Sequence, residues 1–229
     1  MPTADEIAIL LLSLKVGLVA VGLGAVPAFG CALLLARGRF PGKWALDALV
    51  LLPLVLPPVV TGWLLLRTFG PHGPAGAALE RWFGLTLVFR WTGAALAAGV
   101  MAFPLMVRTM RLSIEAVDRR LEEAARTLGA GRWRVLATIT LPLSGPGIVA
   151  GLVLGFVRSL GEFGATITFA SSIAGETRTL PLAIYGALQV PGGETAVTRL
   201  ALLSILLSLG ALLLSEWLVR RAGARAEAA

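Results

Sequence analysis

Residues 122–142 read EEAARTLGAGRWRVLATITLP and form the longest polar-rich interruption in an otherwise apolar chain. Four residues around its start share the spacing that places side chains on one face of a helix. These residues are Leu121, Ala124, Ala125 and Leu128. Glu122 and Glu123 fall on the polar side of the same helix. The pattern predicts a short amphipathic helix.

A glycine break separates this helix from a second amphipathic run. Gly129 suits a left-handed helix cap, and Gly131 follows it closely. The second run has its own helical spacing, through Trp133, Leu136 and Ile139 or Thr140. We expect Pro142 and Pro146 to end it. Two short helices joined by a glycine elbow can fit a groove in a partner protein, and the alternative is an amphipathic hairpin on a lipid surface.

The composition places the chain among integral membrane proteins. Of its 229 residues, 57% are hydrophobic and only 14% are charged, against about 25% charged residues in soluble domains. The single cysteine, Cys31, and the single histidine, His72, exclude a disulfide framework and a His/Cys metal cluster from this chain alone. The net charge of +7 is explained by arginines at the ends of apolar runs, so it does not indicate nucleic-acid binding.

Five apolar runs are long enough to cross a bilayer as helices. They cover residues 7–36, 44–69, 91–108, 147–170 and 198–219. We expect the third helix to continue as a polar extension through residue 129. Residues 180–190 are too short to cross, which indicates a re-entrant or interfacial helix, and residues 70–90 indicate a loop with one interfacial helix. The predicted fold class is an all-α integral membrane protein with five spans and a short extra helix.

The distribution of basic residues predicts the orientation of these spans. Residues 37–43, 108–134 and 220–225 carry three, seven and three Lys or Arg, whereas the opposite side carries five. Basic residues favour the cytoplasmic side of a membrane. The acidic start, MPTADEI, lacks the basic region of a signal peptide, so the first run is predicted to be a retained span. We therefore expect an extracytoplasmic N-terminus and a cytoplasmic C-terminus.

Two features inside the predicted spans have both a structural and a functional interpretation. Pro57 and Pro58 free backbone carbonyl groups, which suits either a packing kink or a broken helix that lines a pathway. Arg158 and Glu162 are four residues apart and are expected to share a helix face. They form either a structural ion pair or, with the nearby Thr166, a polar element of a pathway or gate.

The central stretch is similar to the EAA loop of binding-protein-dependent ABC importer permeases. That motif reads EAA, three residues, G, nine residues and I-x-L-P, and residues 123–142 match it throughout. The resemblance implies a type I ABC importer transmembrane domain over residues 1–229, with a cytoplasmic coupling loop at residues 116–142 that sits in a cleft of an ATPase subunit. The implied coupling residues are Glu122, Glu123, Ala124, Ala125, Gly129, Ile139, Leu141 and Pro142.

Later residues resemble the molybdate permeases within this family. The resemblance rests on residues 159–166 (SLGEFGAT), 175–179 (GETRT) and 191–194 (PGGE). Sulfate permeases have a related GE-[FY]-G stretch, so the second and third segments carry the distinction. The implied substrate is molybdate, and the alternative is another tetrahedral oxyanion such as tungstate, sulfate or thiosulfate.

The resemblance implies an assembly of several subunits in the lipid of the cytoplasmic (inner) membrane. The permease would act as a homodimer with two cytoplasmic ABC ATPase subunits and an extracytoplasmic oxyanion-binding protein. The sequence has no G-x-x-x-x-G-K-[ST] phosphate loop, so we expect no cofactor in this chain, with ATP and Mg²⁺ on the ATPase. We expect no catalytic residue either.

The rival classes are a membrane-embedded enzyme, which needs a catalytic constellation within the spans, and a passive channel, which has no use for a coupling loop.

Overall fold

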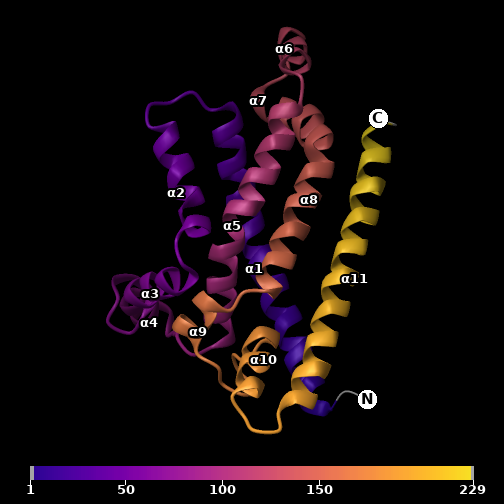
Figure 1. The fold of residues 1–229 in the computed structure, drawn as a ribbon. Helices are drawn as coiled ribbons and strands as arrows, with labels where there is room; N and C mark the ends of the chain where they lie inside the picture. Colours follow the sequence, from indigo (N-terminus) through magenta and orange to yellow (C-terminus); the bar gives the residue numbers. More distant parts are fainter. Residues whose placement is uncertain (1–2, 228–229) are drawn as a thin grey trace.

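The computed structural model describes residues 3–227, and every regular element within them is a helix. Four long helices run side by side, namely α1 (Ala4–Arg37), α5 (Trp91–Ala116), α8 (Leu141–Leu160) and α11 (Glu194–Glu227) (Figure 1). The shorter helices are α2 (Lys43–Val55), α3 (Pro58–Phe69), α4 (Pro74–Phe83), α6 (Arg119–Thr127), α7 (Arg132–Val135), α9 (Gly164–Ala170) and α10 (Leu180–Leu188). The first and last described residues lie at opposite ends of the bundle, as an odd number of crossings requires.

The number of crossings agrees with the prediction, although several ends differ. Within the described residues, four helices are long and apolar enough to cross a membrane, and α2 with α3 adds a fifth if the pair counts as one crossing. α1 begins before residue 7 because Thr3 and Glu6 form a capping box. α11 extends beyond both predicted ends of the last run. α10 and α4 confirm the short helices expected within residues 180–190 and 70–90.

The second predicted span is two helices and not one helix with a packing kink. α2 and α3 meet at an angle of 113°. Leu56 and Pro57 between them have extended backbones, with ψ of 143° and 132°. Each of these residues precedes a proline, whose ring disfavours the helical conformation of the residue before it. α2 therefore ends at this point, and α3 begins at Pro58 in a new direction.

The fourth predicted span, residues 147–170, is also interrupted. α8 ends at Leu160 and α9 begins at Gly164. In the break, the Glu162 carboxylate accepts a hydrogen bond from the backbone N–H of Ala165 at 2.9 Å. The side chain thus takes the place of a backbone partner at the start of α9. Glu162 lies beyond the end of α8 and so does not share a helix face with Arg158, which corrects that expectation, but the two side chains form the expected ion pair.

The two interrupted spans meet, because α3 packs against α9. Glycine makes this close approach possible from both sides. A Cβ atom on Gly62 of α3 would lie 2.7 Å from the Ala165 carbonyl oxygen, and one on Gly164 of α9 would lie 2.6 Å from Pro58 Cβ. Neither distance is compatible with van der Waals contact, so both positions require the absence of a side chain.

Small residues and methionines fill the centre of the bundle. One buried cluster joins α1 and α5 and includes Ala28, Ala32, Ala102, Met106 and Met110. α8 packs on the same cluster, and a Cβ atom on Gly155 would lie 2.5 Å from Cγ of Met106. Small residues let helix backbones approach closely, which is a common way of packing helices inside a membrane.

The third predicted helix ends earlier than expected. α5 stops at Ala116 and does not continue to residue 129. The carboxylate of Asp118 accepts a hydrogen bond from the backbone N–H of Arg120 at 2.9 Å and so caps a separate helix, α6. Aspartate stabilises a helix start in this way, because it satisfies a backbone donor that has no partner within the helix.

Pro142 and Pro146 do not end the second amphipathic run, contrary to the prediction. α7 passes through a π-helical turn at Leu136–Thr140 into α8, so residues 132–160 form one helix of 29 residues. In the π turn, the backbone N–H of Leu141 donates to the Leu136 carbonyl. We attribute the tolerance of Pro142 to this wider turn, since a proline ring clashes with the carbonyl of the preceding turn in a regular α-helix.

The contact between α3 and α9 gives a first testable prediction. Gly62→Ala is expected to destabilise the protein by about 1–3 kcal/mol, because the added methyl group overpacks the contact. The matched control is Gly22→Ala in α1, where an added Cβ meets no atom within 4 Å. That control is expected to stabilise the helix slightly, since alanine favours helix over glycine. Thermal unfolding midpoints in detergent measure both variants, and equal midpoints would contradict the described packing.

Candidate functional site

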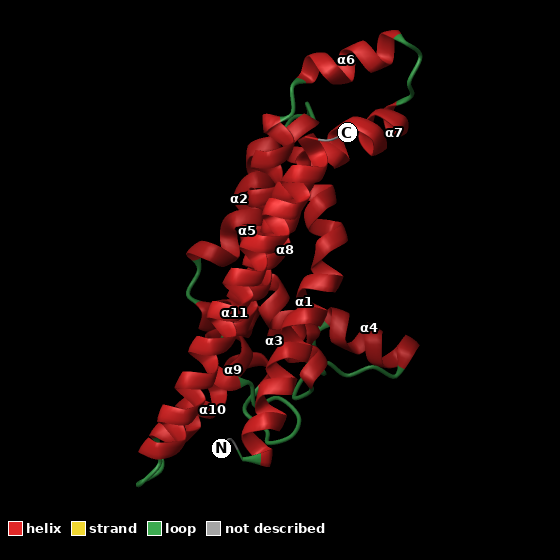
Figure 2. Ribbon diagram, turned by 90° about the vertical axis from the view of Figure 1, so that its right-hand side faces the viewer, coloured by secondary structure: helices red, strands yellow, loops and turns green. Residues whose placement is uncertain are grey.

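The connection between α5 and α8 lies beyond the ends of the long helices (Figures 1 and 2). α6 forms the outermost part, and α7 leads back into α8. The α1–α2 turn and the C-terminal end of α11 lie at this same end, whereas α3, α4, α9 and α10 lie at the opposite end. The backbones of the three basic segments are therefore gathered at one end of the molecule, as the charge distribution predicts.

A sharp elbow separates α6 from α7. Gly129 has a φ of +86°, the left-handed conformation that the sequence predicts and that glycine adopts without strain. The backbone N–H groups of Gly129 and Ala130 donate to the carbonyls of Arg126 and Ala125, each at 3.0 Å. These bonds close the end of α6 and fix the direction in which the chain returns.

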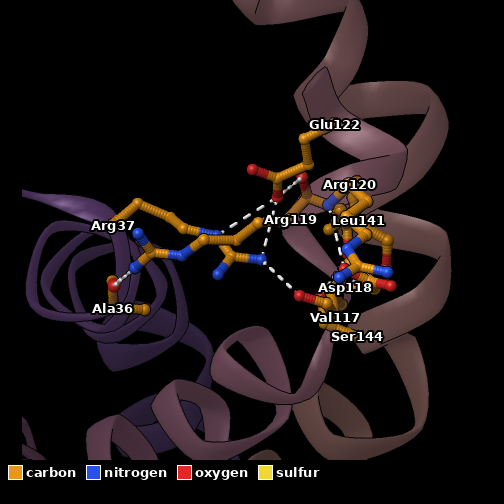
Figure 3. Close-up of polar contacts among 10 residues, drawn as sticks. Ala36, Arg37, Val117, Asp118, Arg119, Arg120, Glu122, Leu141 and Ser144 are labelled. Atoms are coloured by element: carbon orange, nitrogen blue, oxygen red, sulfur yellow. Dashed lines mark hydrogen bonds and ion pairs between the residues drawn. The ribbon is translucent and has the colours of Figure 1, made fainter. Parts of the chain in front are cut away.

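Glu122 connects α6 to the bundle (Figure 3). Its Oε1 atom lies 2.9 Å from Nη2 and 3.1 Å from Nε of Arg37, the last residue of α1. The hydroxyl of Thr140 donates to the same oxygen at 2.8 Å. Glu122 is buried, so the polar side of α6 on which it was predicted faces the bundle at this residue. It joins α1, α6 and the helical segment that leads into α8.

Backbone carbonyls add further connections at the same place. Nη2 of Arg37 donates to the Val117 carbonyl at 2.9 Å, just after the end of α5. From α6, Nη2 of Arg119 donates to the carbonyl of Ala36 in α1 at 3.4 Å (Figure 3). Two arginines thus satisfy carbonyl groups that have lost their helical partners at the ends of α1 and α5. The base of the projecting loop is therefore held to two long helices.

The other side of the loop is exposed and apolar. Leu128 is 88% exposed and Trp133 is 74% exposed. Glu123 and Ala124 are exposed as well, while Ala125 is half-buried. The apolar face predicted from the spacing therefore exists, and the described part of the chain, residues 3–227, leaves it exposed. An exposed apolar surface on a firmly held support is typical of a site that binds another protein.

The last residues of the motif belong to the long helix and not to the elbow. Ile139 is half-buried, whereas Leu141 and Pro142 are exposed where the π turn passes into α8. Val135 and Thr140 are buried on the inward side of the same segment. The motif residues 123–142 thus lie along the loop from α6 to the start of α8, and they do not form a single cluster.

The second group of candidate residues lies at the opposite end of the molecule. Nη1 of Arg158 lies 2.7 Å from Oε2 of Glu162, at the break between α8 and α9. Pro57 and Pro58 are brought to this break by the contact of Pro58 with α9, and Thr166 is buried within α9. No group of three or more His, Cys, Asp and Glu residues within positions 3–227 is arranged to hold a metal ion.

Residues 175–179 form a structural turn that their motif does not reveal. Oε1 of Glu176 accepts a hydrogen bond from the backbone N–H of Trp91 at the start of α5, at 3.3 Å. The hydroxyl of Thr177 donates to the Ser171 carbonyl at 3.0 Å and accepts from the Ile173 N–H at 2.8 Å. The turn therefore attaches the connection between α9 and α10 to α5.

Sequence reasoning did not single out the partners of Glu122. In the sequence, Arg37 is one basic residue of a loop, and Thr140 is a position of the second helical run. Arg37 and Glu122 are 85 residues apart, and no helical period relates residues at such a separation. The one available signal is that Arg37 immediately follows a long apolar run, which places it at the same end of the bundle as the loop.

Removal of the Glu122 carboxylate is expected to loosen α6. Glu122→Ala leaves the Arg37 charge without its buried partner, which costs about 3 kcal/mol. The measurement is the rate of tryptic cleavage after Arg126 in the detergent-solubilised protein, followed by mass spectrometry. The matched control is Glu123→Ala, which removes the neighbouring exposed carboxylate and is expected to cleave at the original rate. Equal cleavage rates in the two variants would contradict the anchoring role.

Comparison with known proteins identifies the family of this chain. Residues 28–223 match the family of binding-protein-dependent transport system inner membrane components. The chain is 59% identical over 226 residues to the molybdenum transport system permease protein ModB of Escherichia coli (strain K12), with 98% of each chain covered. It is 56% identical over 216 residues to the protein of the same name from Haemophilus influenzae, with 94% of each covered.

A solved structure supports the fold. The MetNI methionine ABC transporter in inward-facing conformations matches with a TM-score of 0.75 and 17% identity, and 96% of this chain and 99% of that chain are covered. The alignment covers almost the whole of each chain, so the two proteins share their overall fold. This chain therefore belongs to the family of binding-protein-dependent transport system inner membrane components, and its fold is that of a type I ABC importer transmembrane domain.

Proposed function

We propose that this chain is the membrane-spanning permease subunit of an ATP-driven importer that carries molybdate across the cytoplasmic membrane. The observation that carries the proposal is the similarity, over nearly the whole chain, to two molybdenum transport permeases. Another tetrahedral oxyanion, such as tungstate, sulfate or thiosulfate, is the alternative substrate, because these anions share the shape and charge of molybdate. The chain supplies the pathway, and ATP hydrolysis takes place on a partner subunit.

Residues 116–142 are proposed to form the cytoplasmic coupling loop within a single permease domain. The exposed Glu123, Ala124 and Leu128 provide the contact surface, in which the small alanine permits close approach and the carboxylate adds a directional charge. Glu122 supports this surface from inside through its contacts with Arg37 and Thr140. Firm anchoring matters because a force on α6 must move α1 and α8, and a loose loop would absorb the movement.

The proposed assembly contains two copies of this chain, two cytoplasmic ABC ATPase subunits and an extracytoplasmic oxyanion-binding protein. ATP and Mg²⁺ bind to the ATPase, in keeping with a sequence that has no phosphate loop. ATP binding closes the ATPase pair, draws the two coupling loops together and opens the pathway outward, and hydrolysis resets it. The gathering of the basic segments at the end that carries α6 supports a cytoplasmic location for that end and for the C-terminus, with the N-terminus outside.

The pathway is proposed to run beside the two interrupted spans. Irregular backbone at membrane depth is tolerated only where protein covers it or where it lines a water-filled cavity. The breaks at Pro57–Pro58 and at Glu162 fulfil this condition together, since α3 and α9 cover part of each other. Arg158, Glu162 and Thr166 lie at or next to the break between α8 and α9, and we assign them to the pathway or its gate.

Substrate choice is tested by uptake of labelled molybdate in cells or vesicles that contain the complete importer. Unlabelled molybdate and tungstate are expected to compete with the label, because the two anions are nearly identical in size and charge. Sulfate in tenfold excess is expected to compete weakly. Uptake of labelled sulfate without uptake of labelled molybdate would contradict the proposed substrate.

Coupling is tested by reversing the charge of Glu123. Glu123→Arg is expected to weaken co-purification of the ATPase subunit and to reduce uptake about tenfold or more, since a loss of about 1.4 kcal/mol in association is a tenfold effect. The matched control is Glu80→Arg, the same charge reversal at an exposed position of α4 at the opposite end of the bundle. Normal co-purification and normal uptake in the Glu123 variant would refute its role.

A further inference from the structure

The ion pair between Arg158 and Glu162 is unequal in burial and in bonding. The side chain of Glu162 is only 2% exposed, whereas that of Arg158 is 28% exposed. Both carboxylate oxygens of Glu162 are engaged, one by Arg158 Nη1 at 2.7 Å and one by the Ala165 N–H at 2.9 Å. Within residues 3–227, this carboxylate is the only hydrogen-bond or ion-pair partner of the Arg158 side chain. A guanidinium carries five N–H donors, so Arg158 has donors left for another ligand.

The pair does not serve the usual purpose of joining two helices that are distant in sequence. It spans only the break between α8 and α9, and the main contacts of α9 with the bundle are made by α3 and α5. The ion pair of Glu6 with Arg199, at 2.9 Å, does join two helices that are distant in sequence, α1 and α11. A charged residue within a membrane span is costly, and its presence at a helix break points to a function beyond packing.

The position of Arg158 is that of a substrate contact in a transporter. Substrate sites of membrane transporters are formed where helices are interrupted, and here two interrupted spans meet through Pro58 and Gly164. The α3 side of this contact holds another unused polar group. Thr61 is buried, and its hydroxyl oxygen has no hydrogen-bond partner within residues 3–227. A buried hydroxyl without a partner is destabilising, which favours a partner that is present only during transport.

The carboxylate of Glu162 gives the site the weak affinity that transport requires. A doubly charged oxyanion beside an uncompensated arginine in a poorly solvated place would be held tightly, because Coulomb attraction is strong at low dielectric constant. A pathway must bind its ion well enough to admit it and weakly enough to release it. Glu162 offsets the positive charge of Arg158 through its contact with Nη1, which leaves hydrogen-bond donors on the guanidinium without a strong electrostatic attraction for the anion.

We propose that Arg158 contacts the translocated oxyanion through its free N–H donors, and that Glu162 is a positioning residue that orients Arg158 and cancels its charge so that the anion is released. This inference rests on the proposed function, because it takes the substrate to be a tetrahedral oxyanion. The two residues of the pair have separate roles. Removal of the Glu162 charge is therefore expected to increase retention of the anion, and removal of the Arg158 charge is expected to abolish it.

The test measures retention of labelled molybdate and, in parallel, of labelled sulfate by the assembled permease–ATPase complex without binding protein or ATP. The unmodified complex is expected to retain neither anion above background. Glu162→Gln is expected to retain an oxyanion, because Arg158 then carries an uncompensated charge, and to transport about tenfold more slowly. The double variant Arg158→Gln/Glu162→Gln is expected to lose this retention. Arg158→Lys is expected to transport faster than Arg158→Gln, since it keeps a cationic donor.

The matched control is Glu6→Gln, which breaks the other buried ion pair at the same end of the bundle and is expected to retain no anion. The amount of assembled complex is measured for every variant. Absence of retention in Glu162→Gln, or equal retention in Glu6→Gln or in the double variant, would overturn the inference. Failure of the unmodified complex to import any oxyanion would instead contradict the proposed function, so the two failures are distinguishable.

Discussion

The buried contact between Glu122 and Arg37 is the interaction on which the projecting loop depends. One carboxylate oxygen receives the Arg37 guanidinium from the end of α1 and the Thr140 hydroxyl from the segment that leads into α8. Breaking such a buried pair from one side costs about 3–5 kcal/mol, because it leaves an unpaired charge. The short helix α6 has few other contacts with the bundle. The exposed face with Leu128 and Trp133 keeps its position because Glu122 holds the helix beneath it.

Two ends of the molecule are specialised in different ways. At one end, a continuous helix of 29 residues carries the loop directly into the bundle, so a movement of the loop is passed on along a stiff element. At the other end, the spans are broken, and α3 and α9 pack against each other across two glycines. A continuous helix at one end and interrupted helices at the other suit a protein that opens a pathway in response to a partner.

Some features could be predicted because they depend on local spacing. The number of crossings, the elbow at Gly129, the exposed apolar face of α6 and the gathering of basic segments at one end all follow from periodicity, glycine chemistry and the preferences of charged residues. Other features depend on how the chain accommodates a proline, which local spacing does not determine. Pro142 was expected to end the helix but is accommodated by a π turn. For Pro57 and Pro58 the sequence left a packing kink and a broken helix open, and the structure shows the broken helix, with an angle of 113°.

The sequence by itself determined the class of the protein, its crossings and the motif that indicates its family, because these properties are written in composition and in short-range spacing. Only the tertiary structure decided that Glu122 is buried against Arg37 and that the breaks at Pro58 and Gly164 meet. It also showed that residues 175–179 attach to the start of α5. These contacts join residues that are many helical turns apart, and their partners become neighbours only when the long helices pack and bring their ends to the same side of the bundle.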